Sequence, residues 1–344
     1  MASYFEADSA DELWVKAASA LTSGGVACQA ESRGGRTREL LHCLFVLHNP
    51  RARWVLSRVP AMNPAFAIAE VFWILLGRND SRFINYWNPV LPRYAGEGNH
   101  YHGAYGHRLR SSHGVDQLQR AYEVLRSDPA SRQVTLQIWD SRIDLPTDLG
   151  SPAAPDIPCN IAACLKVRDG RLSWLQLMRS NDVFLGLPYN IVQFTVLQEV
   201  IAGWLGLEVG DFALMVDSLH LYDQNAELMK IGAIPKIDAH QYPSFALSKE
   251  SFDDVVPRVA SALQSLTNSA LTTMELRALC NANWPCDYRD FLLICAADAA
   301  RRREWAREEE WASAQCRRPL LKLAYEAWAQ RCRKSPDQTG IGNG

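Results

Sequence analysis

The chain carries the run Asp156-Ile157-Pro158-Cys159-Asn160 and, further along, the run Arg179-Ser180-Asn181-Asp182-Val183-Phe184-Leu185-Gly186-Leu187-Pro188-Tyr189-Asn190-Ile191. Between them lie two alternating apolar stretches, Ile161–Val167 and Leu172–Met178, joined by Arg168-Asp169-Gly170-Arg171. Asp-Gly between two such stretches predicts a β-hairpin, because glycine supplies the positive φ of a tight turn. The hairpin would bring the cysteine beside the first arginine of the second run. A guanidinium beside a thiol favours the thiolate, which is the nucleophilic form.

Both runs, together with His220-Leu221-Tyr222, resemble the thymidylate synthase family, which includes the pyrimidine nucleotide hydroxymethylases. The matching positions are Pro158-Cys159 and Arg179-Ser180-x-Asp182-x-x-Leu185-Gly186-x-Pro188-x-Asn190-Ile191, and the similarity extends roughly over residues 32–230. The resemblance implies an α/β (α+β) fold, in which a mixed sheet with flanking helices forms a homodimer through the sheet face.

Composition and charge exclude several classes of protein. The 344 residues are 48% hydrophobic and 22% charged, with a net charge of −2, so we expect neither a general nucleic-acid surface nor a membrane surface. The chain has no apolar run long enough to span a bilayer and no signal-like start, which predicts a cytoplasmic protein. The nine cysteines include no CxxC pair and no zinc spacing, so we expect no metal site.

The pattern divides the chain into a catalytic domain, residues 1–245, and a helical C-terminal extension, residues 246–344. The extension contains charged, alanine-rich runs such as Ala299–Arg317 and Leu320–Arg331, which are helical in pattern. We recognise no family in the extension.

Several elements of the catalytic domain carry clear local signals. Ser9 caps a helix that should run to about Thr22, and Asn63-Pro64 begins an almost wholly apolar helix. Leu40–Leu47 reads as a strand, and Pro188 begins a long helix that Gly206 ends. The segment from Asp80 to His102 reads as an aromatic-rich loop with short turns.

The resemblance implies one-carbon transfer from 5,10-methylenetetrahydrofolate to C5 of a pyrimidine nucleoside monophosphate. Cys159 would add to C6 as a thiolate and so make C5 nucleophilic. Glu70, a carboxylate inside the apolar helix, matches the glutamate that organises water and protons, and a lone buried Glu is costly unless it is paired or used. Tyr105 matches a tyrosine of the active-site wall.

Other residues match positions that bind the nucleotide or the folate in the family. Asn190 would pair with O4 and N3-H of uracil, so uridylate is favoured over cytidylate. His220 and Tyr222 match the pair on the sugar 3′-hydroxyl, and Asp182, with Gly186, matches the folate side. The residues expected to bind the phosphate, the last of which would reach across from the partner subunit, are Arg179, Ser180, Arg33 and Arg132. Ribose and deoxyribose are both compatible with these residues.

The chain also departs from the family. Asn160 stands where the family has a histidine, and Leu91, in an ungapped count, stands where it has the tryptophan that shields the exocyclic methylene. Pro60-Ala61 replaces a Lys-Arg pair that meets the glutamate tail of the folate, with Arg58 the nearest cation. No C-terminal closing peptide is recognisable.

These departures favour a hydroxymethylase, in which water rather than hydride completes the reaction. Asn160, which can donate and accept at once, could hold that water. The alternatives are a methyl-forming thymidylate synthase, a nucleotide-binding paralogue without catalysis, and a cysteine hydrolase using Cys159 and His220. The hydrolase is the weakest, because no oxyanion motif accompanies the cysteine.

Overall fold

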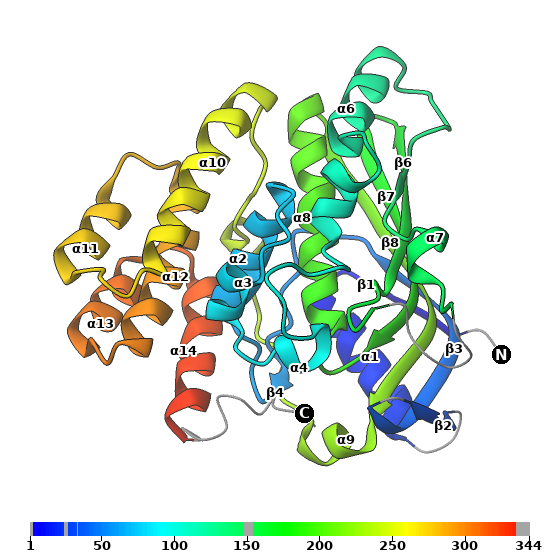
Figure 1. Ribbon diagram of the computed structural model, residues 1–344, viewed down its shortest axis with the longest axis horizontal. Coiled ribbons are helices and arrows are strands. Elements are labelled where there is room, and N and C mark those ends of the chain that lie inside the picture. Colours follow the sequence, from blue (N-terminus) through cyan, green and yellow to red (C-terminus); the bar gives the residue numbers. More distant parts are fainter. Residues whose placement is uncertain (1–2, 24–26, 33, 148–153, 335–344) are drawn as a thin grey trace.

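A seven-stranded mixed sheet lies on one side of a stack of helices (Figure 1). The computed structural model describes residues 3–23, 27–32, 34–147 and 154–334. The strands of the large sheet are β1 (Ser3–Ala7), β2 (Cys28–Ser32), β3 (Gly35–Leu47), β5 (Thr135–Gln137), β6 (Asn160–Arg168), β7 (Arg171–Asp182) and β8 (Glu208–Tyr222). A small second sheet pairs β4 (Arg58–Val59) with β9 (Lys230–Ile231). The mixed sheet with flanking helices confirms the predicted fold class.

The order of the large sheet is β1-β3-β8-β7-β6-β5, with β2 added to β3. The pairs β1–β3 and β7–β8 are parallel, and the other pairs are antiparallel. β3 is long enough to pair along one edge with two strands, β2 at residues 35–39 and β1 at residues 43–47. The parallel pair β7–β8 is joined by the long helix α8, as a parallel connection requires.

The predicted hairpin is formed by β6 and β7, with Arg168 opposite Arg171. The turn residues Asp169 and Gly170 have φ values of 50° and 72°, both positive as a primed turn requires. The hairpin prediction is therefore confirmed, and both strands are longer than the apolar stretches that indicated them.

The helices form layers behind the sheet. α8 packs against β7 and β8, α2 packs against α8, and α12 packs against the other side of α2. Figure 1 shows the C-terminal helices on the side of α2 that faces away from the sheet. The helices are α1 (Ala10–Thr22), α2 (Pro64–Leu75), α3 (Ser81–Trp87), α4 (Pro92–Ala95), α5 (Tyr105–His107), η1 (Arg108–Ser112), α6 (Gln117–Ser127), α7 (Ser141–Asp144), α8 (Leu187–Leu205), α9 (Asp223–Leu228), η2 (Ala239–Gln241), α10 (Lys249–Leu266), α11 (Thr273–Asn281), α12 (Cys286–Arg302), α13 (Ala306–Gln315) and α14 (Pro319–Lys334).

The predicted caps are present at the ends of three helices. Ser9 Oγ accepts from the backbone N–H of Glu12 at 3.2 Å, and Asn63 Oδ1 accepts from that of Phe66 at 3.1 Å. Gly206 ends α8 with a φ of 67°, a conformation that favours glycine. α2 and α8 are buried on nearly all sides, which explains why their sequences show no polar face.

Two segments differ from the expectation. Residues 80–102 contain α3 and α4, where we expected loop and turns, because short helices of this kind are stabilised by burial of side chains such as Phe83 and Trp87 rather than by periodicity. The run Ala299–Arg317 is broken between α12 and α13, where Glu304 has a φ of 59°. Within the described part of the chain, no helix is long and apolar enough to cross a membrane.

A buried carboxylate on α8 connects several parts of the fold. Glu199 is fully buried and forms ion pairs with Arg53 at 2.6 Å and with Arg51 at 2.9 Å. It also accepts a hydrogen bond from Ser244 Oγ at 2.8 Å, which ties the segment before α10 to α8. Removing one partner of a buried pair leaves the other charge uncompensated.

We therefore predict that Glu199→Ala lowers the free energy of unfolding by about 3–5 kcal/mol, because Arg53 would remain buried without its carboxylate. The matched control is Asp253→Ala, which removes the exposed pair with Lys249 and should cost no more than about 0.5 kcal/mol. Urea unfolding followed by circular dichroism measures both. Equal losses in the two variants would contradict the structural role given to Glu199.

Candidate active site

The ends of the central strands are irregular where they approach the helices. In β7 the buried positions alternate regularly up to Met178 and resume out of step at Asn181. In β3 and β8 the irregularity falls at His42 and Asp217, which are left out of the register, and His42 has a φ of 56°. A regular strand presents every second side chain to one face. Here four consecutive residues, 179–182, line the same cavity.

This cavity has a volume of about 900 Å³, at the upper end of the range of small-molecule sites. It lies between the ends of β7 and β8, the helices α2 and α8, and the loops before Cys159. Most of the residues predicted from the sequence line it, namely Glu70, Tyr105, Cys159, Arg179, Ser180, Asp182, Gly186, Asn190, His220 and Tyr222. The fold therefore brings together residues from distant parts of the chain.

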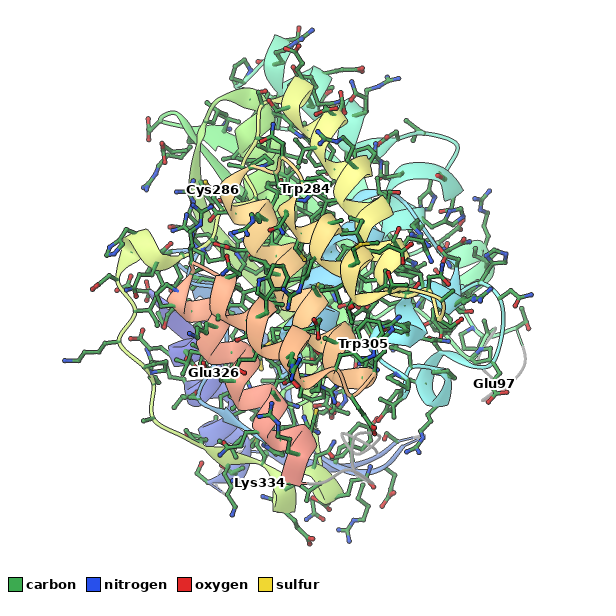
Figure 2. The ribbon with its side chains drawn as sticks, turned by 90° about the vertical axis from the view of Figure 1, so that its left-hand side faces the viewer. Glu97, Trp284, Cys286, Trp305, Glu326 and Lys334 are labelled. Atoms are coloured by element: carbon green, nitrogen blue, oxygen red, sulfur yellow. The ribbon has the colours of Figure 1, made fainter. Side chains whose placement is uncertain are left out.

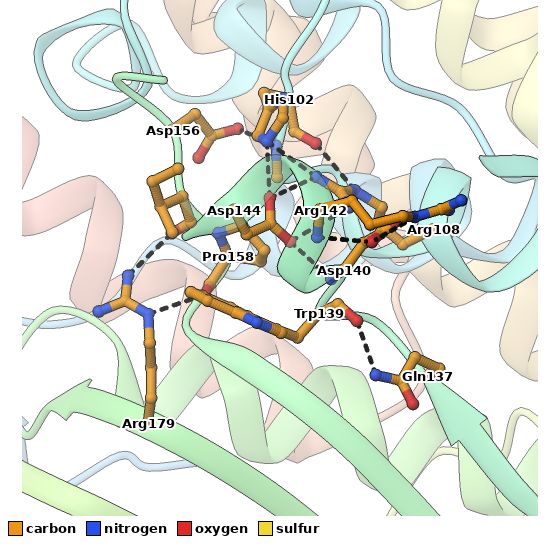
Figure 3. Close-up of polar contacts among 12 residues, drawn as sticks. His102, Arg108, Gln137, Trp139, Asp140, Arg142, Asp144, Asp156, Pro158 and Arg179 are labelled. Carbon is orange, nitrogen blue, oxygen red and sulfur yellow. Dashed lines mark hydrogen bonds and ion pairs between the residues drawn. The ribbon is translucent and has the colours of Figure 1, made fainter. Parts of the chain in front are cut away.

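Arg179 braces the loop that carries the candidate nucleophile, Cys159. Its backbone N–H donates to the carbonyl of Cys159 at 2.9 Å. Its Nε and Nη2 donate to the carbonyls of Pro158 and Ile157 at 3.0 and 3.1 Å (Figure 3). Nη2 also lies 3.8 Å from Cys159 Sγ. A guanidinium at this position favours the thiolate, so the arrangement suits nucleophilic addition by the sulfur.

A second brace lies behind the same loop. The buried Asp144 carboxylate forms an ion pair with Arg108 at 2.9 Å, and its Oδ1 lies 2.7 Å from His102 Nε2, within hydrogen-bond distance (Figure 3). Next to it, Asp156 accepts from the backbone N–H of Gly103 at 2.7 Å, and burial raises the pKa of Asp156. These contacts attach the residues before Cys159 to the segment that carries Tyr105.

The candidate sugar and phosphate residues lie at the ends of β7 and β8. Ser180 Oγ lies 3.3 Å from Nδ1 of His220, and the rings of His220 and Tyr222 are 5.3 Å apart. A Cβ at Gly34 would lie 2.7 Å from the Tyr222 ring, so a larger residue there would have to displace this ring. Arg33 lies outside the described residues.

Glu70 is paired inside the cavity with a residue that the sequence analysis missed. Gln193 Nε2 donates to Glu70 Oε2 at 2.6 Å, and both side chains line the cavity. Burial raises the pKa of Glu70 to about 7, against the opposite effect of the Gln193 hydrogen bond. A group that titrates near neutral pH is suited to transfer protons. The spacing of Gln193 from Asn190, three residues on one helix, could have indicated it.

Asp182, which the sequence analysis expected to bind folate, has one oxygen that accepts hydrogen bonds and one that does not. Its Oδ1 accepts from the backbone N–H groups of Phe184 at 2.7 Å and Leu185 at 2.8 Å, whereas its buried Oδ2 has no hydrogen-bond partner in the described ranges. Burial raises the pKa of Asp182. A Cβ at Gly186 would lie 2.7 Å from Asn181 Oδ1, so the chain approaches closely there. A ligand with N–H donors, such as a pterin ring, fits the unoccupied oxygen.

Two predicted residues are placed differently from the rest. Asn160 is fully buried behind the cavity, where its Oδ1 accepts from Gln176 Nε2 at 3.0 Å. Its Nδ2 has no hydrogen-bond partner in the part of the chain that is described. Arg132 is exposed and does not line the cavity, so within one subunit it does not reach the site.

The cavity wall does contain a tryptophan, although the position expected for the shielding tryptophan of the family is occupied by Leu91. Leu91 lines the cavity, and so does Trp87, which is fully buried. Tyr105 is half-buried in this region, and desolvation raises its pKa, so its hydroxyl stays protonated. Among the residues that the structure describes, no group of His, Cys, Asp or Glu side chains could hold a metal ion.

Comparison with known proteins gives consistent matches. A family model described as thymidylate synthase matches residues 38–261. The deoxyuridylate hydroxymethyltransferase of Bacillus phage SP01 is 33% identical over 201 residues, which are 55% of this chain and 51% of that protein. The protein of that name from Pseudomonas phage M6 is 33% identical over 164 residues, 47% of this chain and 45% of that protein.

A third relative has a different name. Thymidylate synthase 1/2 of Encephalitozoon cuniculi is 33% identical over 144 residues, which are 42% of this chain and 44% of that protein. The matched region therefore covers about half the length of each of these three relatives.

The raised pKa of Glu70 predicts a pH-dependent stability. Folding favours the protonated carboxyl, so its stabilising contribution is complete below the ordinary pKa of 4.5 and is lost as the pH rises to about 7. Glu70→Gln removes this loss. Between about pH 5.5 and pH 8.5 the variant should therefore gain about 2 kcal/mol of stability relative to the wild type.

Urea unfolding at the two pH values measures this gain, with the exposed Glu97→Gln as the matched control. A constant difference between Glu70→Gln and the wild type at both pH values would show that Glu70 is ionised as in water.

Proposed function

Because the chain belongs to the thymidylate synthase family, we propose that it transfers a one-carbon unit from 5,10-methylenetetrahydrofolate to C5 of a pyrimidine nucleoside monophosphate. Uridylate is the favoured acceptor and 5-hydroxymethyluridylate the favoured product. The observation that carries the proposal is the position of Cys159 Sγ, 3.8 Å from the Arg179 guanidinium at the wall of a cavity of about 900 Å³.

Cys159 would begin the reaction by forming a bond from sulfur to C6 of the pyrimidine. The electron pair of the C5–C6 double bond moves toward O4, and C5 becomes nucleophilic. The folate supplies the one-carbon unit. Loss of the C5 proton would break the bond between the transferred carbon and the folate and leave an exocyclic methylene at C5. Water would add its oxygen to that carbon and lose a proton, and the returning electron pair would expel the sulfur from C6 and restore the C5–C6 double bond. Glu70, with a pKa near neutral pH, would take up and return these protons in the cavity.

The nucleotide would lie across the ends of β7 and β8. The Nη1 of Arg179 makes no hydrogen bond with the described residues, so it can donate to the phosphate beside Ser180. His220 and Tyr222 would hold the sugar. Asn190 donates through Nδ2 to Asn181 Oδ1 at 3.1 Å, which leaves its Oδ1 to accept from N3-H of uracil and its second N–H to donate to O4.

Asp182 and Gly186 would hold the pterin ring, with the unoccupied Asp182 Oδ2 as its acceptor. The aromatic residues of the cavity wall provide surfaces for a flat ring system. An acceptor oxygen beside aromatic surfaces is suited to 5,10-methylenetetrahydrofolate, whose pterin ring carries N–H donors.

Water rather than hydride is proposed to complete the reaction. Leu91 lines the cavity and is smaller than the tryptophan of the family, so it leaves more room for a water molecule. Two of the similar proteins named above are deoxyuridylate hydroxymethyltransferases. The second candidate is a methyl-forming synthase, and the buried Trp87 in the cavity wall favours it, because a large aromatic group can keep water out.

A homodimer through the sheet face is part of the proposal. On the face of the sheet opposite α8, Tyr4, Leu44, Met215 and Leu177 are neighbours in register across four strands. Tyr4 and Met215 are 58% and 43% exposed, which is unusual for a row of large apolar side chains. A second copy would cover this row, and the exposed Arg132 could then reach the partner's phosphate site.

We predict that Cys159→Ser abolishes turnover and leaves uridylate binding within about tenfold, because an alcohol is far less readily ionised than a thiol of pKa about 8.5. Release of tritium from C5 of the nucleotide in the absence of folate reports the thiolate step by itself. Cys164→Ser, on the same strand, is the matched control and should keep the exchange. Exchange retained in Cys159→Ser would refute the nucleophile assignment.

The product distinguishes the two candidate reactions. With uridylate or deoxyuridylate and 5,10-methylenetetrahydrofolate, we expect a 5-hydroxymethyl nucleotide by mass spectrometry and no stoichiometric dihydrofolate by absorbance. Hydroxymethylation leaves the folate reduced, whereas methyl formation oxidises it. One dihydrofolate formed for each product would identify a methyl-forming synthase.

A further inference from the structure

An amide oxygen without a partner lies in the wall of the cavity. Gln193 is 4% exposed, lines the cavity and follows Asn190 by three residues on α8. Its Nε2 donates to Glu70 Oε2 at 2.6 Å, whereas its Oε1 has no hydrogen-bond partner in the described part of the chain. An ionised carboxylate only accepts hydrogen bonds, so Glu70 fixes which end of the amide faces it. A buried acceptor without a donor is costly, so this oxygen points to a donor bound in the cavity.

Glu70 meets solvent on the side of the cavity. Within α2 it alone is not buried, and it lines the cavity. α10, α12 and α14 pack on α2, and Figure 2 shows the C-terminal helices side by side across the face of the molecule that they cover. Beyond the bond from Gln193, no hydrogen bond to the Glu70 carboxylate occurs among the described residues. Both side chains therefore offer an unoccupied oxygen to the same cavity.

A second glutamine on α8 shows what an amide with a structural role does. Gln198 is fully buried, and its Oε1 also lacks a hydrogen-bond partner in the described ranges. Its Nε2 donates to the backbone carbonyls of Leu172 and Gly210 at 2.8 and 2.9 Å, and it does not line the cavity. An unpartnered oxygen alone therefore does not indicate a ligand. The position of Gln193 in the cavity, bonded to a titratable side chain, does.

A water molecule fits the two unoccupied oxygens, because it can donate one hydrogen to each. Its own oxygen would keep lone pairs for the exocyclic methylene at C5. The oxygen–carbon bond would form as one proton passes to Glu70, and the electron pair returning through the ring would expel the sulfur of Cys159 from C6. Burial raises the pKa of Glu70 to about 7, and the Gln193 bond opposes that rise. The amide therefore also keeps part of Glu70 ionised and able to take the proton.

We propose that Gln193 holds the water that completes the reaction against the Glu70 carboxylate, and so directs water rather than another nucleophile to the exocyclic methylene. The proposal rests on the proposed function, because it takes the reaction to end in hydroxymethylation. It assigns two roles to Gln193, which accepts from the water through Oε1 and donates to Glu70 through Nε2. A glutamine that served the fold alone would affect the amount of folded protein and not the fate of the methylene.

The test measures which nucleophile captures the methylene. Each protein is given uridylate, 5,10-methylenetetrahydrofolate and 2-mercaptoethanol, and mass spectrometry measures the ratio of the 5-hydroxymethyl nucleotide to the thioether formed by the thiol. Gln193→Met, which nearly keeps the volume and removes both polar atoms, should shift this ratio toward the thioether by about tenfold or more. Both products come from one intermediate, so weaker nucleotide binding or lower stability does not change their ratio.

The shift should also depend on pH. Loss of the Gln193 donor raises the pKa of Glu70, so less of the carboxylate is ionised and able to accept the proton of the water. The shift caused by Gln193→Met should therefore be larger at about pH 6.5 than at about pH 8.5, where Glu70 is more fully ionised in both proteins. Comparison of the two proteins at equal pH cancels the ionisation of the added thiol.

Gln198→Met is the matched control and should keep the wild-type ratio, since Gln198 lies outside the cavity. Gln193→Asn, whose shorter side chain cannot make both contacts, should show the same shift as Gln193→Met and replaces it if that variant yields too little folded protein. A wild-type ratio in the Gln193 variants, or an equal shift at both pH values, would overturn the inference and leave the proposed reaction intact. Wild-type protein that forms neither of the two products would overturn both.

Discussion

The bonds between Arg179 and the loop that ends at Cys159 hold the candidate site together. One backbone N–H and two side-chain donors of Arg179 meet three successive carbonyls, those of residues 157–159. The loop therefore cannot move away from β7 without losing all three bonds. The same guanidinium lies 3.8 Å from the sulfur, so the contact that orders the loop also favours the charge that the chemistry needs.

The position of β7 then fixes where the neighbouring side chains of the cavity lie. Its other edge pairs with β8, where Asp182 lies opposite His220 and Ser180 lies opposite Ser218. α8, which follows β7 directly, brings Asn190 and Gln193 over the same cavity and pairs Gln193 with Glu70 of α2. The layer beyond α2 completes the cavity through Arg331, so the site uses every layer of the fold.

Much of the secondary structure of residues 1–245 could be predicted, because its signals are local. The hairpin turn, the caps at Ser9 and Asn63 and the glycine after α8 each depend on a few neighbouring residues. α3 and α4 could not be predicted in this way, since they are short and stabilised by burial. The family resemblance supplied the roles of the site residues, and it supplied nothing for the helices after residue 261.

The sequence by itself determined the hairpin that returns the chain to the loop before Cys159, and it indicated the mixed α/β class, because these follow from turn chemistry and alternation along the chain. The tertiary structure decided which side chains meet. The Glu70–Gln193 bond joins residues 123 positions apart, and the Arg331–Ala61 bond joins residues 270 positions apart. It also turned Asn160 toward Gln176 and away from the cavity. No local pattern encodes such contacts, because they depend on how whole layers pack against one another.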